Sequence, residues 1–88
     1  MKKYDLLKGV LVKQKALERL GWDFSGLGIS EPYDHVKIIR CEYTDRLKWS
    51  PCDQYGNDSL AASGDTGDDE KTLEDLDILA IRNQVWQL

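Results

Sequence analysis

The sequence predicts a small α+β domain, in which an N-terminal amphipathic helix packs on a short antiparallel sheet together with a C-terminal helix. Three observations indicate this class. Residues 5–20 place apolar side chains at helical spacing, the run from His35 to Thr44 alternates as a strand does, and an apolar segment follows Thr72. With 88 residues and 41% hydrophobic content, the chain suffices for one core, and we expect a single domain over residues 1–88.

The first predicted element is a helix over residues 5–20. Its apolar side consists of Leu6, Val10, Leu17 and Leu20, with Leu7 and Leu11 beside them. Gly21 follows directly and suits the position after a helix end. Gly9 disfavours this helix by about 1 kcal/mol, and a short strand over residues 9–14 is the alternative.

The middle of the chain predicts a hairpin. Residues 21–34 are rich in turn-forming glycines, and the strand pattern from His35 to Thr44 follows them. A turn near Asp45 and Arg46 returns the chain through a second strand containing Leu47 and Trp49. Pro51 lacks a backbone N–H, so it ends this pairing or lies at a sheet edge.

The last third predicts a loop and then a helix. Residues 53–70 carry turn chemistry, and we expect a flexible acidic loop at about residues 56–71. Thr72 and Asp75 have the spacing of a capping box. The segment after them is either one largely buried helix or a shorter helix that passes into a final strand at residues 83–88.

Charge is distributed unevenly along the chain. Residues 1–20 contain six Lys or Arg and two acids, whereas residues 64–88 contain seven acids and two bases. The whole chain has a net charge of −4. Such separation bears on partners and on self-association rather than on catalysis.

No motif predicts catalysis, a metal or a cofactor, and we expect a protein that is not an enzyme. Asp65-Thr66-Gly67 matches the tripeptide of aspartic proteases, but its turn-rich surroundings indicate an acidic loop. The acids from Asp65 onward also fail the spacing of a calcium-binding EF-hand. Cys41, Cys52 and His35 are too few for structural zinc, although a thiol nucleophile or a disulfide is a minor alternative.

The sequence predicts a cytoplasmic protein. No apolar run of signal-peptide length follows the first lysines, and no segment approaches the roughly 20 apolar residues of a membrane span. In that compartment both cysteines are expected to be reduced.

The preferred functional hypothesis is a non-enzymatic regulator or inhibitor that binds another protein. Small acidic regulators of this kind are common in phages and mobile elements, and some act on nucleic-acid enzymes through a basic groove. The candidate binding residues are acidic and aromatic. The acidic ones are Asp65, Asp68, Asp69, Glu70 and Glu74, and the aromatic ones are Trp22, Trp49 and Tyr55.

Two alternatives belong to other classes. Lys8, Lys15 and Arg19 form a basic stripe on the predicted first helix and could contact nucleic-acid phosphates. The opposite charges of the two ends could also pair between two copies of the chain and give a homodimer.

Overall fold

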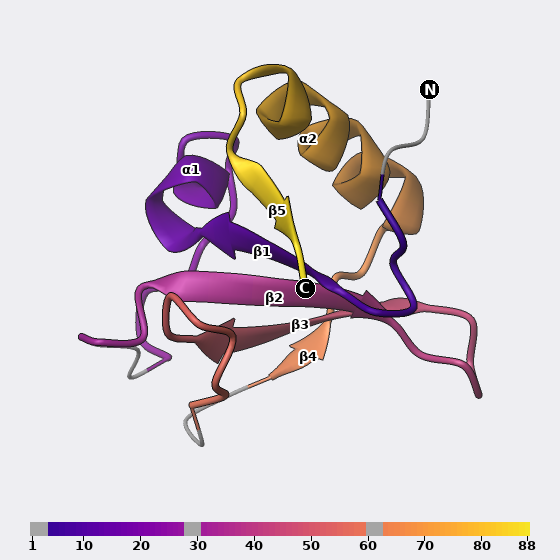
Figure 1. The fold of residues 1–88 in the computed structure, drawn as a ribbon, viewed down its shortest axis with the longest axis horizontal. Helices are drawn as coiled ribbons and strands as arrows, with labels where there is room; N and C mark the ends of the chain where they lie inside the picture. Colours follow the sequence, from indigo (N-terminus) through magenta and orange to yellow (C-terminus); the bar gives the residue numbers. More distant parts are fainter. Residues whose placement is uncertain (1–3, 28–30, 60–62) are drawn as a thin grey trace.

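A five-stranded antiparallel sheet forms the centre of the computed structural model, which describes residues 4–27, 31–59 and 63–88. The strands are β1 (Val10–Lys13), β2 (His35–Arg40), β3 (Leu47–Cys52), β4 (Gly64–Asp65) and β5 (Val85–Gln87). Their order in the sheet is β4-β3-β2-β1-β5, so the last strand lies beside the first (Figure 1). Two helices complete the fold, α1 (Gln14–Glu18) and α2 (Asp69–Ile81).

The strand register divides the sheet into two faces. Val12 lies opposite Val36 of β2 and Val85 of β5, and all three side chains are buried on one face. Because side chains alternate along a strand, Leu11 and its partner Trp86 lie on the other face. We call the first the helix-covered face and the second the open face.

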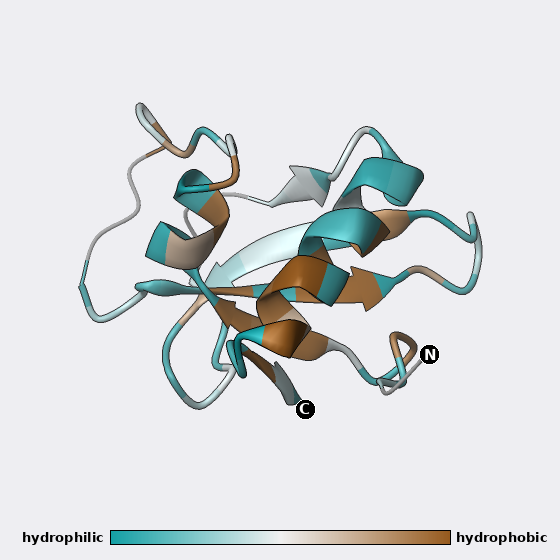
Figure 2. Cartoon of the chain, turned by 90° about the horizontal axis from the view of Figure 1, so that it is seen from above, coloured by the Kyte–Doolittle hydropathy of each residue, from teal (hydrophilic) through white to brown (hydrophobic). Residues whose placement is uncertain are grey.

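The hydrophobic core lies between the helices and the helix-covered face. Leu17 of α1 and Leu79 of α2 belong to the same buried cluster as Val10, Val36 and Ile38 of the strands. Figure 2 shows the hydrophobic residues concentrated in the strands and in the later turns of α2, with hydrophilic residues in its first turns. Both helices therefore serve one core, which confirms the α+β class with an antiparallel sheet.

The helix predicted over residues 5–20 is wrong, because the chain forms strand β1 and only the five-residue helix α1 there. Gly9 has φ +94°, outside the right-handed helical region. The three residues after it are apolar and buried: Val10 and Val12 pack in the core below the helices, and Leu11 is covered on the other face beside Trp86 and Tyr55. A run buried on both faces predicts a central strand as well as it predicts a helix.

The central hairpin is confirmed, with shorter limits. Strand β2 ends at Arg40 rather than Thr44, and β3 pairs with it from Leu47 to Cys52. Pro51 remains within the pairing, opposite Val36. Its carbonyl oxygen accepts a hydrogen bond from the backbone N–H of Ser59 and therefore points away from β2. The nitrogen of Pro51 points in the same direction, so its missing N–H removes no hydrogen bond between β2 and β3.

The C-terminal segment adopts the helix-then-strand alternative, as α2 followed by β5. The cap is Asp68, whose side chain accepts a hydrogen bond from the backbone of Lys71, and not the predicted pair Thr72 and Asp75. The segment predicted as a loop over about residues 56–71 includes β4 and the first turn of α2. Strand β5 then completes the sheet beside β1.

Candidate functional site

Helix α2 presents a stripe of acidic and aliphatic side chains to solvent. Glu70, Glu74 and Asp77 recur at intervals of four and three residues, so they lie on one side of the helix. Two isoleucines fall within the same stripe: Ile78 is 38% exposed and Ile81 is 84% exposed. We call these five residues the acidic face of α2.

The buried side of α2 explains why the acidic face points to solvent. Thr72, Leu76 and Leu79 are buried against the sheet, which fixes the rotation of the helix about its axis. Within the described residues, the carboxylates of Glu70, Glu74 and Asp77 form no hydrogen bond and no ion pair with a side chain. Protein interfaces combine an apolar centre with a polar rim, and this face offers both kinds of group.

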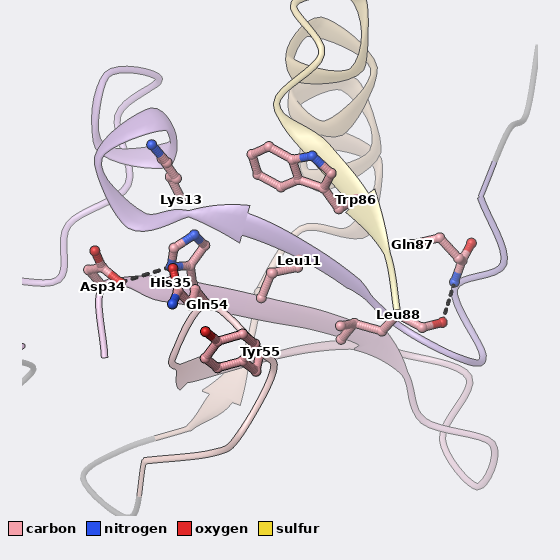
Figure 3. A pocket seen from close by; sticks show the side chains of 9 residues that line it. All are labelled: Leu11, Lys13, Asp34, His35, Gln54, Tyr55, Trp86, Gln87 and Leu88. Carbon is pink, nitrogen blue, oxygen red and sulfur yellow. Dashed lines mark hydrogen bonds and ion pairs between the residues drawn. The ribbon is translucent and has the colours of Figure 1, made fainter. Parts of the chain in front are cut away.

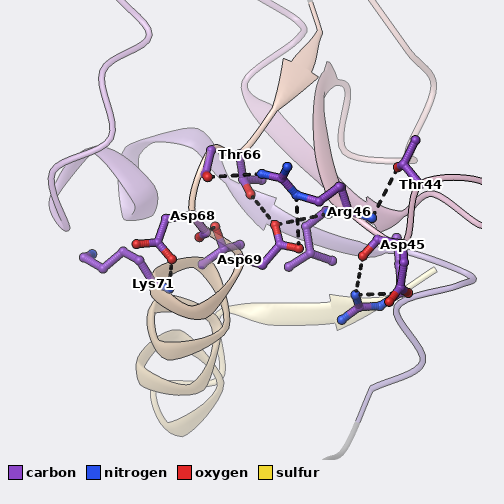
Figure 4. Close-up of polar contacts among 11 residues, drawn as sticks. Thr44, Asp45, Arg46, Thr66, Asp68, Asp69 and Lys71 are labelled. Atoms are coloured by element: carbon purple, nitrogen blue, oxygen red, sulfur yellow. Dashed lines mark hydrogen bonds and ion pairs between the residues drawn. The ribbon is translucent and has the colours of Figure 1, made fainter.

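Two of the predicted acidic residues, Asp68 and Asp69, form polar contacts within the chain instead (Figure 4). Asp69 accepts hydrogen bonds through Oδ1 from the backbone N–H of Leu47 and from the hydroxyl of Thr66, at 3.3 and 3.4 Å. Its other oxygen lies 3.6 Å from Nε of Arg46. Asp68 caps α2, so both carboxylates have partners within the chain.

Asp65 is separated from the acidic face of α2. It lies in β4 opposite Lys48 of β3, and this pair projects from the open face of the sheet. The five acidic residues predicted as one surface are therefore divided: Glu70 and Glu74 share a helix face, whereas Asp65 lies across the sheet.

The predicted aromatic surface is divided in the same way. Trp22 and Trp49 are half-buried against the core, where each ring contacts Phe24 at centroid distances of 6.0 and 5.5 Å. Tyr55 is 76% exposed and lies over the open face. The structure thus gives the first two rings a packing role and leaves Tyr55 accessible.

Sequence reasoning missed Trp86 as a surface residue. It is 43% exposed and lies directly opposite Leu11 of β1 on the open face. The signal was present in the alternation of β5, where Val85 is buried and Trp86 is not, but it depends on knowing that residues 85–87 form a strand.

Trp86 and Tyr55 stand on two sides of a pocket of about 520 Å³ (Figure 3). Leu11, 7% exposed, lies between the two rings. Polar side chains surround this apolar centre, namely those of Lys13, Asp34, His35, Gln54 and Gln87, and Leu88 completes the lining. His35 contacts both the aromatic and the polar part of the lining. Its ring centroid lies 6.5 Å from that of Trp86, and its Nδ1 is 2.8 Å from Oδ1 of Asp34.

The loop that carries Tyr55 is fixed by Asp53. Oδ1 of this carboxylate accepts hydrogen bonds from the backbone N–H groups of Asn57 and Tyr55, both at 2.9 Å. The bond from Asn57 contributes most to lowering the pKa of Asp53 below its usual value. Gly56, at φ +87°, lies against Leu88, where an added Cβ would come within 3.1 Å of the leucine side chain. The position of Tyr55 is therefore determined by the loop.

The predicted basic stripe does not form. Lys8 lies in the turn before β1, whereas Lys15 and Arg19 lie in and just after α1. Without a continuous helix, these three side chains do not share one helical face. The premise of the predicted nucleic-acid-binding helix is therefore absent.

The two cysteines lie at opposite ends of the hairpin. Cys52 pairs with His35, and Cys41 follows the other end of β2, about 20 Å away at strand spacing. They cannot form a disulfide with each other. Burial raises the pKa of the Cys52 thiol to about 12, and a hydrogen bond with the Thr44 side chain lowers the pKa of Cys41.

Among the described residues, no group of three or more His, Cys, Asp or Glu side chains is placed to hold a metal ion. Neither helix in this part of the chain has the length and apolar character needed to cross a bilayer. Comparison with protein-family models, curated proteins and solved structures finds no match to this chain.

Proposed function

We propose that this chain is a non-enzymatic regulator or inhibitor, and that it binds another protein through the acidic face of α2. The observation that carries the proposal is the composition of that face. Three carboxylates without ionic partners in the described residues surround Ile78 and Ile81, two exposed aliphatic side chains. A partner surface with basic groups around an apolar depression would satisfy both kinds of group.

The rest of the fold supports a binding role. Helix α2 is fixed by its buried side and by its cap, so the acidic face is presented without a large ordering cost on association. A basic groove of a nucleic-acid enzyme is one surface of the required chemistry. The two unbridged cysteines fit a reducing compartment, and we include a cytoplasmic location in the proposal.

The proposed interface can be tested by charge reversal. The variant combines Glu70→Lys, Glu74→Lys and Asp77→Lys, all at exposed positions. Immobilised wild-type chain and variant are exposed to the same host lysate. We expect a saturable partner on the wild-type chain only, and its retention should fall as salt rises, because the contacts are partly electrostatic.

The matched control changes the net charge by the same amount elsewhere. It carries Glu18→Lys, Glu31→Lys and Glu42→Lys, which are also exposed. Retention of the partner by this control supports a specific acidic face. Equal loss in both variants, or equal retention by both, would refute the role of α2. A sedimentation run on the purified chain distinguishes a second copy from a different protein as the partner.

A further inference from the structure

The pocket on the open face has the features of a ligand site that the proposed function does not use. It lies across the sheet from α2, and its volume of about 520 Å³ falls within the range of about 300–1,000 Å³ that is typical of small-molecule sites. Its apolar centre is Leu11, with one exposed aromatic ring on each side. Such an arrangement suits a flat ring, because aromatic groups stack on one another.

The walls of the pocket are held in place before any ligand arrives. Trp86 belongs to β5, which pairs with β1, and its neighbour Gln87 donates hydrogen bonds to the carbonyl oxygens of Asp5 and Gly9. The Tyr55 loop is closed by Asp53. It is also attached to the sheet through a 2.8 Å ion pair between Asp58 and Lys37. Ordering these groups would therefore cost a ligand little.

Lys13 provides a cationic group at the rim that can contact an anion. Lys13 follows Leu11 by two residues on the same face of β1, at a distance of about 6.6 Å along the strand. Its ammonium group forms no ion pair within the described residues. Asp34 contributes an acidic side chain to the lining, and its Oδ1 lies 2.8 Å from Nδ1 of His35. The nearby carboxylates of Asp53 and Asp58 likewise have donors in the loop and in the sheet.

A ligand that matches both the aromatic walls and Lys13 is a flat aromatic ring joined to an anionic group a few ångströms away. A nucleotide has this chemistry. We propose that the pocket binds a nucleotide, with the base between Trp86 and Tyr55 and a phosphate at Lys13. The side-chain amide of Gln54, also in the lining, offers a donor and an acceptor to a base edge.

A second hollow beside this pocket does not provide a site for a further phosphate. It shares Lys13 and Asp34 with the pocket, but its lining contains Glu18 and Glu31 as well as Lys15. Those acids would repel a second phosphate. The proposal therefore covers one nucleotide unit in this pocket, either free or as part of a single strand.

Nuclear magnetic resonance can test the site in the whole chain. The three indole N–H signals are followed, with Trp86→Phe identifying its own, while the chain is titrated with AMP, hexathymidylate, inorganic phosphate or indole. We expect AMP and hexathymidylate to shift the Trp86 signal and to leave those of Trp22 and Trp49 unchanged, because the latter two lie on the helix-covered side. A response to AMP alone indicates free nucleotides as ligands, and a response to hexathymidylate alone indicates a single strand. A response to both shows that the site accepts a nucleotide unit from either source.

Variants with matched controls make the test specific. Tyr55→Ala should weaken binding about 5- to 100-fold, as loss of one stacking partner does, whereas Tyr43→Ala should not change it. Tyr43 is 98% exposed in the turn at the far end of the hairpin. Lys13→Gln should weaken binding of AMP but not of indole, and Lys8→Gln should affect neither.

Three results would overturn the proposal. The first is an unmoved Trp86 signal at 10 mM AMP and at a large molar excess of hexathymidylate. The second is indole or an uncharged apolar peptide binding as tightly as AMP, which would indicate an apolar pocket for protein side chains. The third is equal weakening by the pocket variants and by their controls.

Discussion

The indole N–H of Trp22 donates a hydrogen bond of 2.8 Å to Oδ2 of Asp75, a residue that is 2% exposed. The same carboxylate accepts from Nζ of Lys71 at 2.7 and 2.8 Å. This contact joins the segment after α1 to the middle of α2, across 53 positions of sequence. It satisfies a buried charge that would otherwise oppose folding.

Replacing Asp75 should therefore destabilise the fold. Asp75→Ala leaves the Trp22 N–H without its acceptor, and we expect the free energy of unfolding to fall by about 2–3 kcal/mol. Asp77→Ala, two residues further along the same helix and exposed, should change it by less than about 0.5 kcal/mol. Urea unfolding of the two variants measures the difference. Similar values for both would contradict the assigned contact.

Gly9→Ala distinguishes strand β1 from the helix that the sequence pattern favours. At φ +94° an alanine is strained although space is available, so we expect a loss of about 1 kcal/mol. A continuous helix over residues 5–20 would instead gain about 1 kcal/mol from the same change. The sign of the shift in the urea midpoint decides between them.

Asp68 and Glu70 should respond differently to truncation, although the sequence places both in one acidic segment. Asp68→Ala removes the cap of α2 and should cost about 1 kcal/mol. Glu70→Ala should leave stability within about 0.5 kcal/mol, because its carboxylate has no partner in the described part of the chain. Thermal unfolding of both variants provides the measurement, and an equal loss would show that Glu70 also supports the fold.

The two thiols should differ widely in reactivity at pH 8. The pKa of Cys52 is raised to about 12 by burial, so its thiolate is scarce at that pH, whereas Cys41 is only partly buried and its pKa is lowered. We expect iodoacetamide to modify Cys41 first, as mass spectrometry of tryptic peptides would show. Rapid modification of Cys52 in the folded chain would contradict its buried position.

The sequence predicts local elements well where one pattern dominates. The hairpin of β2 and β3 follows from alternation and turn chemistry, since both are set by neighbouring residues. The N-terminal error arises because Val10, Leu11 and Val12 are buried on both faces of a central strand, where a continuous apolar run fits a helix equally well. Only tertiary pairing between β1 and β5 resolves that ambiguity.

The candidate sites were harder to predict, because they depend on which faces meet. Glu70 and Glu74 share a helix face that their spacing predicts. Asp69 and Trp22 instead have partners far away in the sequence, which no local pattern reveals. The pocket beside Trp86 required the register of β5 against β1 and the placement of the Tyr55 loop.

Carboxyl footprinting of the captured complex tests the central claim most directly. The free chain and the complex are labelled with a carbodiimide and an amine, and each carboxylate is quantified by mass spectrometry. The proposed interface predicts that Glu70, Glu74 and Asp77 lose reactivity in the complex while Glu31 and Glu42 keep theirs. Unchanged labelling of the three α2 residues, with protection elsewhere, would contradict binding through this face.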